Sequence, residues 1–187
     1  GIGKAIALKF ASMGADIIFN YVRGHQAAVQ TQSEIGDMGV RCVRVKANLA
    51  DTSKIKFLFS EIKREFRSLD ILVNNAASGV PRTAIQLEEK HWNWTHNVNA
   101  KAPWLCAVEA SYLMTEGGSI VNITSLGSQS VLPSYFSVGT SKAALETMTR
   151  YLAVEFAPKG ISVNAVSGGY VETDASLVEI NPLVLTE

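Results

Sequence analysis

A tyrosine and a lysine in the stretch SYFSVGTSK are the residues of this sequence best suited to acid–base and oxyanion chemistry. Tyr135 stands seven positions before Lys142. Seven residues of α-helix turn through about 700°, so both side chains return to one face, about 10.5 Å apart along the axis. A phenol and an ammonium group placed in this way can converge on one bound molecule. An isolated tyrosine near a helix start is otherwise most often a packing residue, so the rest of the sequence must supply the site.

Two glycines at the start of the sequence could bring a phosphate group close to a helix. Gly1 and Gly3 flank Ile2 and open a helical pattern. Small residues there let an anion approach backbone N–H groups at the positive end of the helix. The same pattern also fits an ordinary helix start. A strand that ends about 18 residues further on favours the interpretation as a dinucleotide site.

The end of that strand, Asn20-Tyr21-Val22-Arg23, contains no acidic residue. An Asp or Glu here would bind a ribose 2′-hydroxyl and repel a 2′-phosphate, whereas an arginine binds the phosphate through charge-assisted hydrogen bonds. The stretch therefore favours NADPH over NADH. The alternative is that Arg23 is a solvated surface arginine, and that the neighbouring His25 is simply exposed.

The segments that must position these residues alternate between strands and helices. Apolar, β-rich runs predict strands at 15–21, 40–49, 119–125 and 161–169, and residues 69–79 predict a buried strand that runs into a small-residue loop. After the opening helix, periodic segments and their stop signals predict helices at 24–38, 52–66, 88–114 and 135–157. Asp51 is the predicted N-cap of the helix at 52–66.

Strands that are apolar on both faces and alternate with helices predict a parallel sheet covered by helices on both sides. The predicted fold class is α/β, a doubly wound, Rossmann-like sheet. We interpret residues 1–187 as one domain, because no repeat or linker interrupts them. Ligands of such folds bind at the carboxyl ends of the strands.

Composition excludes several kinds of partner. Lys+Arg and Asp+Glu are equal at 17 each, which argues against nucleic acid or an anionic membrane as a partner. Cys42 and Cys106 lack a metal-type spacing and predict reduced core thiols in a cytoplasmic protein. His91 and His96 lie on different faces of a predicted helix, so we expect packing of the tryptophans around them and no metal site.

Six motifs together resemble the short-chain dehydrogenase/reductase family. They are GIG at 1–3, NNAA at 74–77, NVNAKAPW at 97–104, IVNITS at 120–125, SKAALE at 141–146 and ISVNAVSGG at 161–169. The resemblance runs to about Asp174 and implies that the sequence is a fragment. The sheet's central strand would precede Gly1, and a final strand would follow Glu187.

The resemblance also implies which residues contact a nicotinamide dinucleotide. These residues lie in the opening helix, at the ends of the predicted strands and in the predicted helix at 135–157. They are Gly1, Ile2, Gly3, Tyr21, Arg23, Asn48, Leu49, Asn75, Ala76, Ala77, Lys142, Gly168, Val171 and Thr173.

One departure from the family pattern narrows the expected reaction. The usual active pair is Tyr-x-x-x-Lys, but Val138 occupies the tyrosine position, thirteen residues after Ser125. The Tyr135-x6-Lys142 spacing is that of the enoyl-acyl-carrier-protein reductases, a divergent branch, and the sequence looks most like its NADPH-dependent FabL-type members. This resemblance implies reduction of trans-2-enoyl thioesters in fatty acid synthesis. Tyr135 would bind the thioester oxygen and Lys142 the ribose hydroxyls.

Two further catalytic candidates carry open alternatives. By resemblance, Ser125 binds a substrate carbonyl or makes a hydrogen bond within its own loop. Asn99 braces the helix at 135–157 and a water near Lys142, or is a buried structural amide.

Relatives pack the helices at 88–114 and 135–157 into a dimer interface, so the resemblance implies a homotetramer. Rival functions are a 2,4-dienoyl-CoA reductase, a 3-oxoacyl reductase and a non-catalytic dinucleotide-binding protein.

Overall fold

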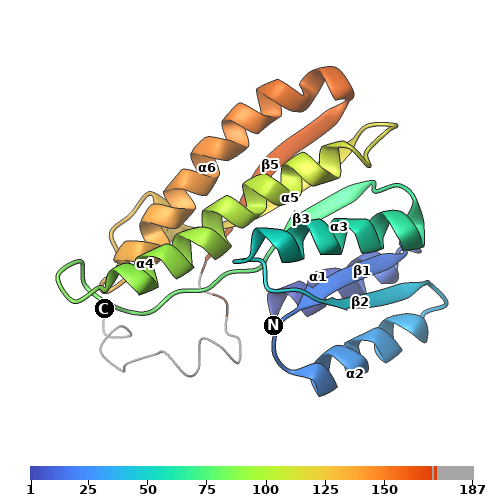
Figure 1. The fold of residues 1–187 in the computed structure, drawn as a ribbon, viewed down its shortest axis with the longest axis horizontal. Helices are drawn as coiled ribbons and strands as arrows, with labels where there is room; N and C mark the ends of the chain where they lie inside the picture. Colours follow the sequence, from blue (N-terminus) through green and yellow to red (C-terminus); the bar gives the residue numbers. More distant parts are fainter. Residues whose placement is uncertain (170, 172–187) are drawn as a thin grey trace.

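The computed structural model describes residues 1–169 and 171, in which helices and strands alternate along the chain (Figure 1). The elements are α1 (Ile2–Ala11), β1 (Ile17–Tyr21), α2 (His25–Gly36), β2 (Cys42–Lys46), α3 (Thr52–Phe66), β3 (Ile71–Asn74), α4 (Glu89–His96), α5 (Ala102–Ser111), β4 (Gly118–Ser125), α6 (Phe136–Phe156) and β5 (Ile161–Gly168).

All strand pairs among these elements are parallel, which confirms the predicted α/β class. β1 pairs with β2, and a second sheet has the order β3-β4-β5. Within the described residues the strands form two sheets, which fits the prediction of one incomplete sheet whose central strand would precede Gly1. A cavity of about 1110 Å³ separates them and is lined by β1 and β3 along their lengths. The resemblance to the family places the central strand of the sheet in this position.

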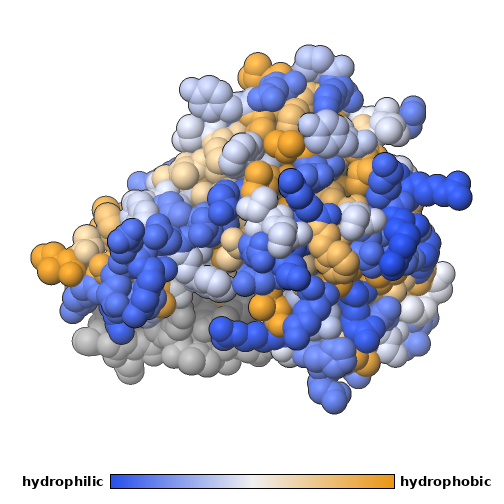
Figure 2. All heavy atoms as spheres, in the orientation of Figure 1, coloured by the Kyte–Doolittle hydropathy of each residue, from blue (hydrophilic) through white to orange (hydrophobic). Residues whose placement is uncertain are grey.

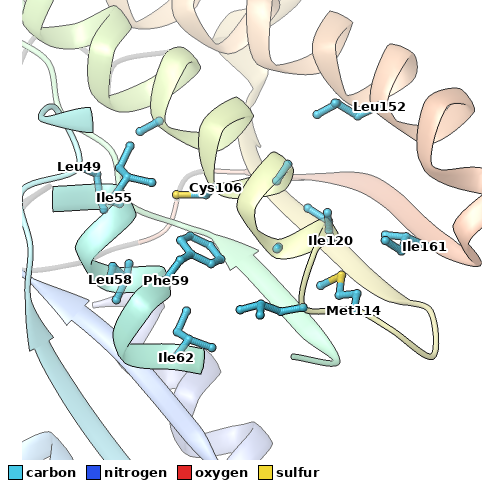
Figure 3. Close-up of a cluster of buried hydrophobic side chains, with 14 of the residues drawn as sticks. Leu49, Ile55, Leu58, Phe59, Ile62, Cys106, Met114, Ile120, Leu152 and Ile161 are labelled. Carbon is cyan, nitrogen blue, oxygen red and sulfur yellow. The ribbon is translucent and has the colours of Figure 1, made fainter. Parts of the chain in front are cut away.

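Helices cover both faces of the strands, as predicted. Neighbouring residues of β1 show this, because successive strand side chains point to opposite faces. Ile17 packs against α1 and α2 with Ala11 and Ile35, whereas Ile18 packs against the larger core on the other face. That larger core joins α3, α5 and α6 to the strands (Figure 3). Its labelled members include Ile55, Leu58, Phe59, Ile62, Cys106, Ile120 and Leu152.

The helix at 52–66 has the predicted bounds, because its signals are local. Ile55, Leu58 and Ile62 recur at helical spacing and are buried. The Asp51 side chain accepts a hydrogen bond from the Ser53 backbone N–H at 2.8 Å, which satisfies one donor of the first turn. The prediction of Asp51 as the N-cap is confirmed.

The long helix predicted at 88–114 is wrong in one respect, because it is not continuous. A π-helical turn, Asn97–Lys101, separates α4 from α5. Pro103 stands near the start of α5 and has no N–H with which to bond the Asn99 carbonyl four residues back. The wider π-turn accommodates this loss and turns Asn99 into the interior.

The strands end at one common edge, and the helices that follow them begin there. α6 begins at Phe136, so Tyr135 is its N-cap rather than its first helical residue. At the other end of α6, a 3-10 turn leads to Gly160, whose positive φ of 69° ends the helical segment.

Among the residues described, no helix has both the length and the apolarity that a membrane crossing requires.

Candidate active site

Tyr135 lies at the carboxyl end of β4, facing the last residue of that strand. Its hydroxyl donates a hydrogen bond to the Ser125 Oγ atom at 3.3 Å. The preceding residue, Ser134, has a positive φ of 57°, which turns the chain sharply into α6. The Arg82 backbone N–H bonds the Ser134 carbonyl oxygen at 2.9 Å and so ties the loop after β3 to this turn. These contacts fix the backbone that carries the phenol.

The tyrosine ring rests on a glycine of the loop after β4. A Cβ atom on Gly127 would lie 2.6 Å from the Cε1 atom of Tyr135, closer than side-chain carbons approach. Gly139 packs from the other side, where a Cβ would lie 2.6 Å from the Gly127 carbonyl oxygen. The ring is therefore held between a close-fitting loop and the first turns of α6.

Lys142 reaches the same end of β4 from the interior. Its side chain is 5% exposed, and its Nζ atom donates a hydrogen bond to the Ile123 carbonyl oxygen at 2.6 Å. Burial lowers the pKa of Lys142 to about 8. The structure thus brings Tyr135 and Lys142 to residues two positions apart at the end of one strand, Tyr135 to Ser125 and Lys142 to Ile123.

Ser125 makes the loop hydrogen bond that was one of its two expected roles. Its Oγ atom accepts from the Gly127 backbone N–H at 3.3 Å and also lies within reach of Tyr135. The hydroxyl can therefore orient the phenol as well as the loop.

Asn99 is fully buried and ties the loop after β3 to α6. Its Oδ1 atom accepts from the Ser78 N–H at 2.8 Å, and its Nδ2 atom donates to the Ser78 carbonyl oxygen at 2.8 Å. The same amide donates to the Ser141 Oγ atom at 3.0 Å, one residue before Lys142. This arrangement supports the bracing role. A catalytic role for Asn99 stays a prediction.

Val138, which the resemblance places at the family's usual tyrosine position, has an aliphatic side chain that fills space. Its Cγ2 atom stands where a Cβ on Gly79 would lie, so the valine packs on the loop after β3. Valine has no proton to donate to a substrate. The phenol that contacts Ser125 is instead that of Tyr135.

The start of α1 fits the phosphates of a dinucleotide. Gly1 is its N-cap and makes no side-chain cap hydrogen bond. The first N–H groups of a helix are suited to bind an anion. Gly3 leaves room that a larger residue would fill, since a Cβ there would lie 2.6 Å from the Asn75 Nδ2 atom. Asn75 and Ala76 line the same cavity. Because most of this cavity is the gap between β1 and β3, only its end at the carboxyl edge is the candidate cofactor site.

The candidate 2′-phosphate site lies at the end of β1. Tyr21 and Arg23 both line the cavity end, and Arg23 is exposed. The Tyr21 hydroxyl lies 2.8 Å from the Nδ1 atom of His25, in the first turn of α2. Sequence reasoning missed this contact, because it depends on how the chain turns through Gly24, where φ is 69°.

The remaining predicted cofactor contacts are only partly accessible. The Leu49 side chain is buried in the core, so its backbone alone can meet a ligand, while Asn48 caps its own turn by accepting from the Ala50 N–H at 3.1 Å. Ile2 and Ala77 are exposed near the same edge. At the end of β5, Gly168 lies beside the exposed Val171, and Thr173 lies outside the described residues.

Of the two histidines in the stretch HWNWTH, His96 packs on a tryptophan, and His91 lies 3.8 Å from the Glu88 carboxylate. The His96 ring stacks on Trp92 with 3.8 Å between centroids, and the Trp94 indole N–H donates to the Ser78 Oγ atom at 2.6 Å. No group of three potential metal ligands occurs in the part of the chain that the structure describes.

Comparison with known proteins adds to this geometry. A family model described as "Enoyl-(Acyl carrier protein) reductase" matches residues 1–181. The chain belongs to the short-chain dehydrogenase/reductase family. A solved structure of a mutant member of this family from Serratia marcescens superposes with a TM-score of 0.91 at 30% identity, over 94% of this chain and 72% of that one.

Two curated relatives show the range of names within the family. The 1-cyclohexenylcarbonyl-CoA reductase of Streptomyces collinus is 37% identical over 94% of this chain. The 3-oxoacyl-(acyl-carrier-protein) reductase FabG of Staphylococcus aureus is 32% identical over 100% of this chain and 78% of its own length. The chain spans 62% of the length of the Streptomyces protein. Members of the family bind a nicotinamide dinucleotide.

Proposed function

We propose that this protein is an NADPH-dependent enoyl-acyl-carrier-protein reductase of fatty acid synthesis. The observation that carries the proposal is the phenol at the end of β4, where the Tyr135 hydroxyl contacts Ser125. Val138, which the resemblance assigns to the family's usual tyrosine position, packs on Gly79 and offers no hydroxyl group. The description of the matching family model supports the same reaction. So does the Streptomyces relative, whose name denotes reduction of a cyclohexenyl thioester.

The residues at the strand ends suit this chemistry. Bound NADPH supplies the hydride. Gly1 and Gly3 would hold its pyrophosphate, Arg23 its 2′-phosphate, and Lys142 its ribose hydroxyls. Tyr135 would donate a hydrogen bond to the thioester oxygen, where negative charge grows as the β-carbon is reduced. A donor aimed at developing charge stabilises the transition state more than the ground state.

The assay that tests the proposal compares two thioesters of equal chain length. We expect the purified protein to consume NADPH with crotonyl thioester and to leave acetoacetyl thioester unchanged. Turnover of acetoacetyl thioester instead would favour the 3-oxoacyl reductase that the Staphylococcus relative exemplifies. A shift of NADPH fluorescence without consumption of any enoyl or dienoyl thioester would favour a non-catalytic binding protein.

Arg23→Ala tests the preference for NADPH. A hydrogen bond to a charged group contributes about 1.5–3 kcal/mol, so the KM for NADPH should rise roughly 10- to 100-fold, while the KM for NADH stays within twofold. Steady-state kinetics with both coenzymes measures this difference. Arg64→Ala, which removes an exposed arginine from α3, is the matched control. Equal effects on both coenzymes would refute the assignment of Arg23 to the 2′-phosphate.

Gly127→Ala tests the placement of the phenol without removing it. The added Cβ would displace the Tyr135 ring. A displacement of about 1 Å can lower a rate about 10²-fold. We expect a fall of that order in kcat with crotonyl thioester and an unchanged dissociation constant for NADPH. Gly36→Ala is the control, since no atom of the described residues lies within 4 Å of its Cβ position. A variant as active as the wild type would contradict the close packing.

Assembly and location complete the proposal. Trp104 of α5 and Tyr151 and Val154 of α6 are exposed large apolar residues, with Tyr151 at 74% and Val154 at 78% exposure. Figure 2 shows apolar residues interspersed with polar ones on the face that carries these helices. Packing of α5 and α6 against a second copy would cover these residues and build the homotetramer. The free thiols of Cys42 and Cys106 support a cytoplasmic location.

A further inference from the structure

The carboxylate of Glu146 on α6 forms hydrogen bonds to the end of β4 and to the turn that follows it, next to the candidate active site. Glu146 is half-buried, and its Oε1 atom accepts hydrogen bonds from the Thr124 hydroxyl at 2.7 Å and from the Ser128 hydroxyl. Its Oε2 atom accepts from the Gln129 side-chain amide at 3.3 Å. These partners lie on both sides of Ser125, so one carboxylate holds the strand end and the turn that follows it.

The same turn contains the contacts of the tyrosine. The Ser128 hydroxyl lies within reach of the Ser125 carbonyl oxygen at 2.7 Å, and the Ser125 Oγ atom meets the Tyr135 hydroxyl. Gly127, the surface on which the tyrosine ring rests, lies between Ser125 and Ser128. A change in the position of Ser128 would therefore move both surfaces that place the phenol.

Glu146 lies one helical turn after Lys142 on α6. Residues four apart on a helix share a face, so Lys142 and Glu146 stand one turn apart on α6. Lys142 bonds the Ile123 carbonyl oxygen and Glu146 bonds the next side chain of the strand, Thr124. Two successive turns of α6 thus hold two successive residues of β4.

The carboxylate is ionised in its surroundings. Partial burial raises the pKa of Glu146, but hydrogen bonds from Ser128, Thr124 and Gln129, together with the charge of Arg150, outweigh burial and leave the pKa below its ordinary value. An ionised carboxylate only accepts hydrogen bonds, so it can hold several hydroxyl and amide donors at once.

We propose that Glu146 is a positioning residue for the proposed enoyl reduction, one that acts through the Ser125–Ser128 turn on the Tyr135 hydroxyl. The inference rests on the proposed function, in which Tyr135 stabilises the developing oxyanion. It assigns to the last residue of the motif SKAALE a role that its sequence position does not reveal, because its partners are 17 to 22 residues away in the chain.

Glu146→Ala should lower kcat with crotonyl thioester about 10-fold or more, while the dissociation constant for NADPH stays within twofold, because hydrogen bonds to a carboxylate are strong. Glu146→Gln keeps one acceptor oxygen and should recover part of the loss. Glu116→Ala, an exposed glutamate in the turn before β4, is the control and should match the wild type. Wild-type kcat in Glu146→Ala would overturn the proposal.

A double-mutant cycle separates positioning from a merely structural role. If Glu146 acts through the phenol, Glu146→Ala should cause little further loss of kcat in a Tyr135→Phe background. An equal loss in both backgrounds would overturn the proposal, because it would show an effect independent of Tyr135.

A readout that needs no turnover keeps this inference separate from the enoyl reductase assignment. In protein with isotope-labelled tyrosine rings, the Tyr135 resonance is identified by its loss in Tyr135→Phe. Glu146→Ala should shift or broaden that resonance, and Glu116→Ala should leave it unchanged. An unmoved resonance in Glu146→Ala would overturn the positioning role. Failure of the wild type to reduce crotonyl thioester would instead refute the proposed function.

Discussion

Tyr135→Phe is expected to abolish most turnover of crotonyl thioester, with kcat reduced roughly 10²- to 10³-fold, because loss of one donor to a developing oxyanion typically costs this much. The substitution deletes one oxygen atom and keeps the ring that packs on Gly127. The fold and the site at the start of α1 should therefore be unaffected. Fluorescence titration should give an unchanged dissociation constant for NADPH.

Tyr112→Phe is the matched control for this experiment. Tyr112 follows α5 and is 67% exposed, so loss of its hydroxyl should leave turnover unchanged. Wild-type kcat in Tyr135→Phe would show that Tyr135 is a packing residue at the start of α6. A loss of NADPH binding equal to the loss of rate would show instead that the hydroxyl acts on the cofactor.

Lys142→Met should weaken NADPH binding roughly 10- to 100-fold and lower kcat/KM with it, because the ammonium group is the predicted donor to the ribose hydroxyls. Methionine has a similar length and leaves little cavity in a site where the lysine is 5% exposed. Fluorescence titration with NADPH measures the change. Lys159→Met, on the 3-10 turn after α6, is the control. Unchanged affinity in Lys142→Met would exclude a role in holding the cofactor.

The same lysine predicts a dependence on pH. Burial lowers the pKa of Lys142 to about 8 in the free protein. NADPH affinity should therefore fall as the pH rises through about 8, since the neutral amine has lost its charge and one donor. Lys142→Met should show no such fall. The unfolded chain keeps its proton up to the ordinary pKa of 10.5, so it binds more protons between about 8 and 10.5. The free energy of unfolding contributed by Lys142 should therefore rise with pH across that range.

Sequence patterns predicted most elements of the fold where the signals were local. The bounds of α3 follow from the Asp51 cap and the spacing of Ile55, Leu58 and Ile62, all within one helix. The alternation of strands and helices predicted the parallel pairing. The gap between β1 and β3 agrees with the expectation, taken from the family resemblance, that the central strand of the sheet would precede Gly1. The π-turn at 97–101 was missed because it depends on the inward contacts of Asn99.

The candidate site was partly predictable for the same reason. The spacing of Tyr135 and Lys142 predicted that the two side chains converge on one bound molecule, and in the structure both contact the end of β4. The expected helical position of Tyr135 was wrong, because Ser134 turns the chain and leaves the tyrosine as N-cap. Glu146 was missed because its role depends on hydroxyls from another element. Buried polar contacts of this kind follow from tertiary packing, which a sequence pattern does not contain.

Transfer of a labelled hydride tests the central claim most directly. The purified protein is incubated with crotonyl thioester and NADPH deuterated at C4 on the transferred face, and the product is analysed by mass spectrometry and NMR. We predict a butyryl thioester that carries one deuterium at its β-carbon, formed by the wild type and nearly absent with Tyr135→Phe. A crotonyl thioester recovered without deuterium, while acetoacetyl thioester yields a deuterated 3-hydroxybutyryl product, would contradict it.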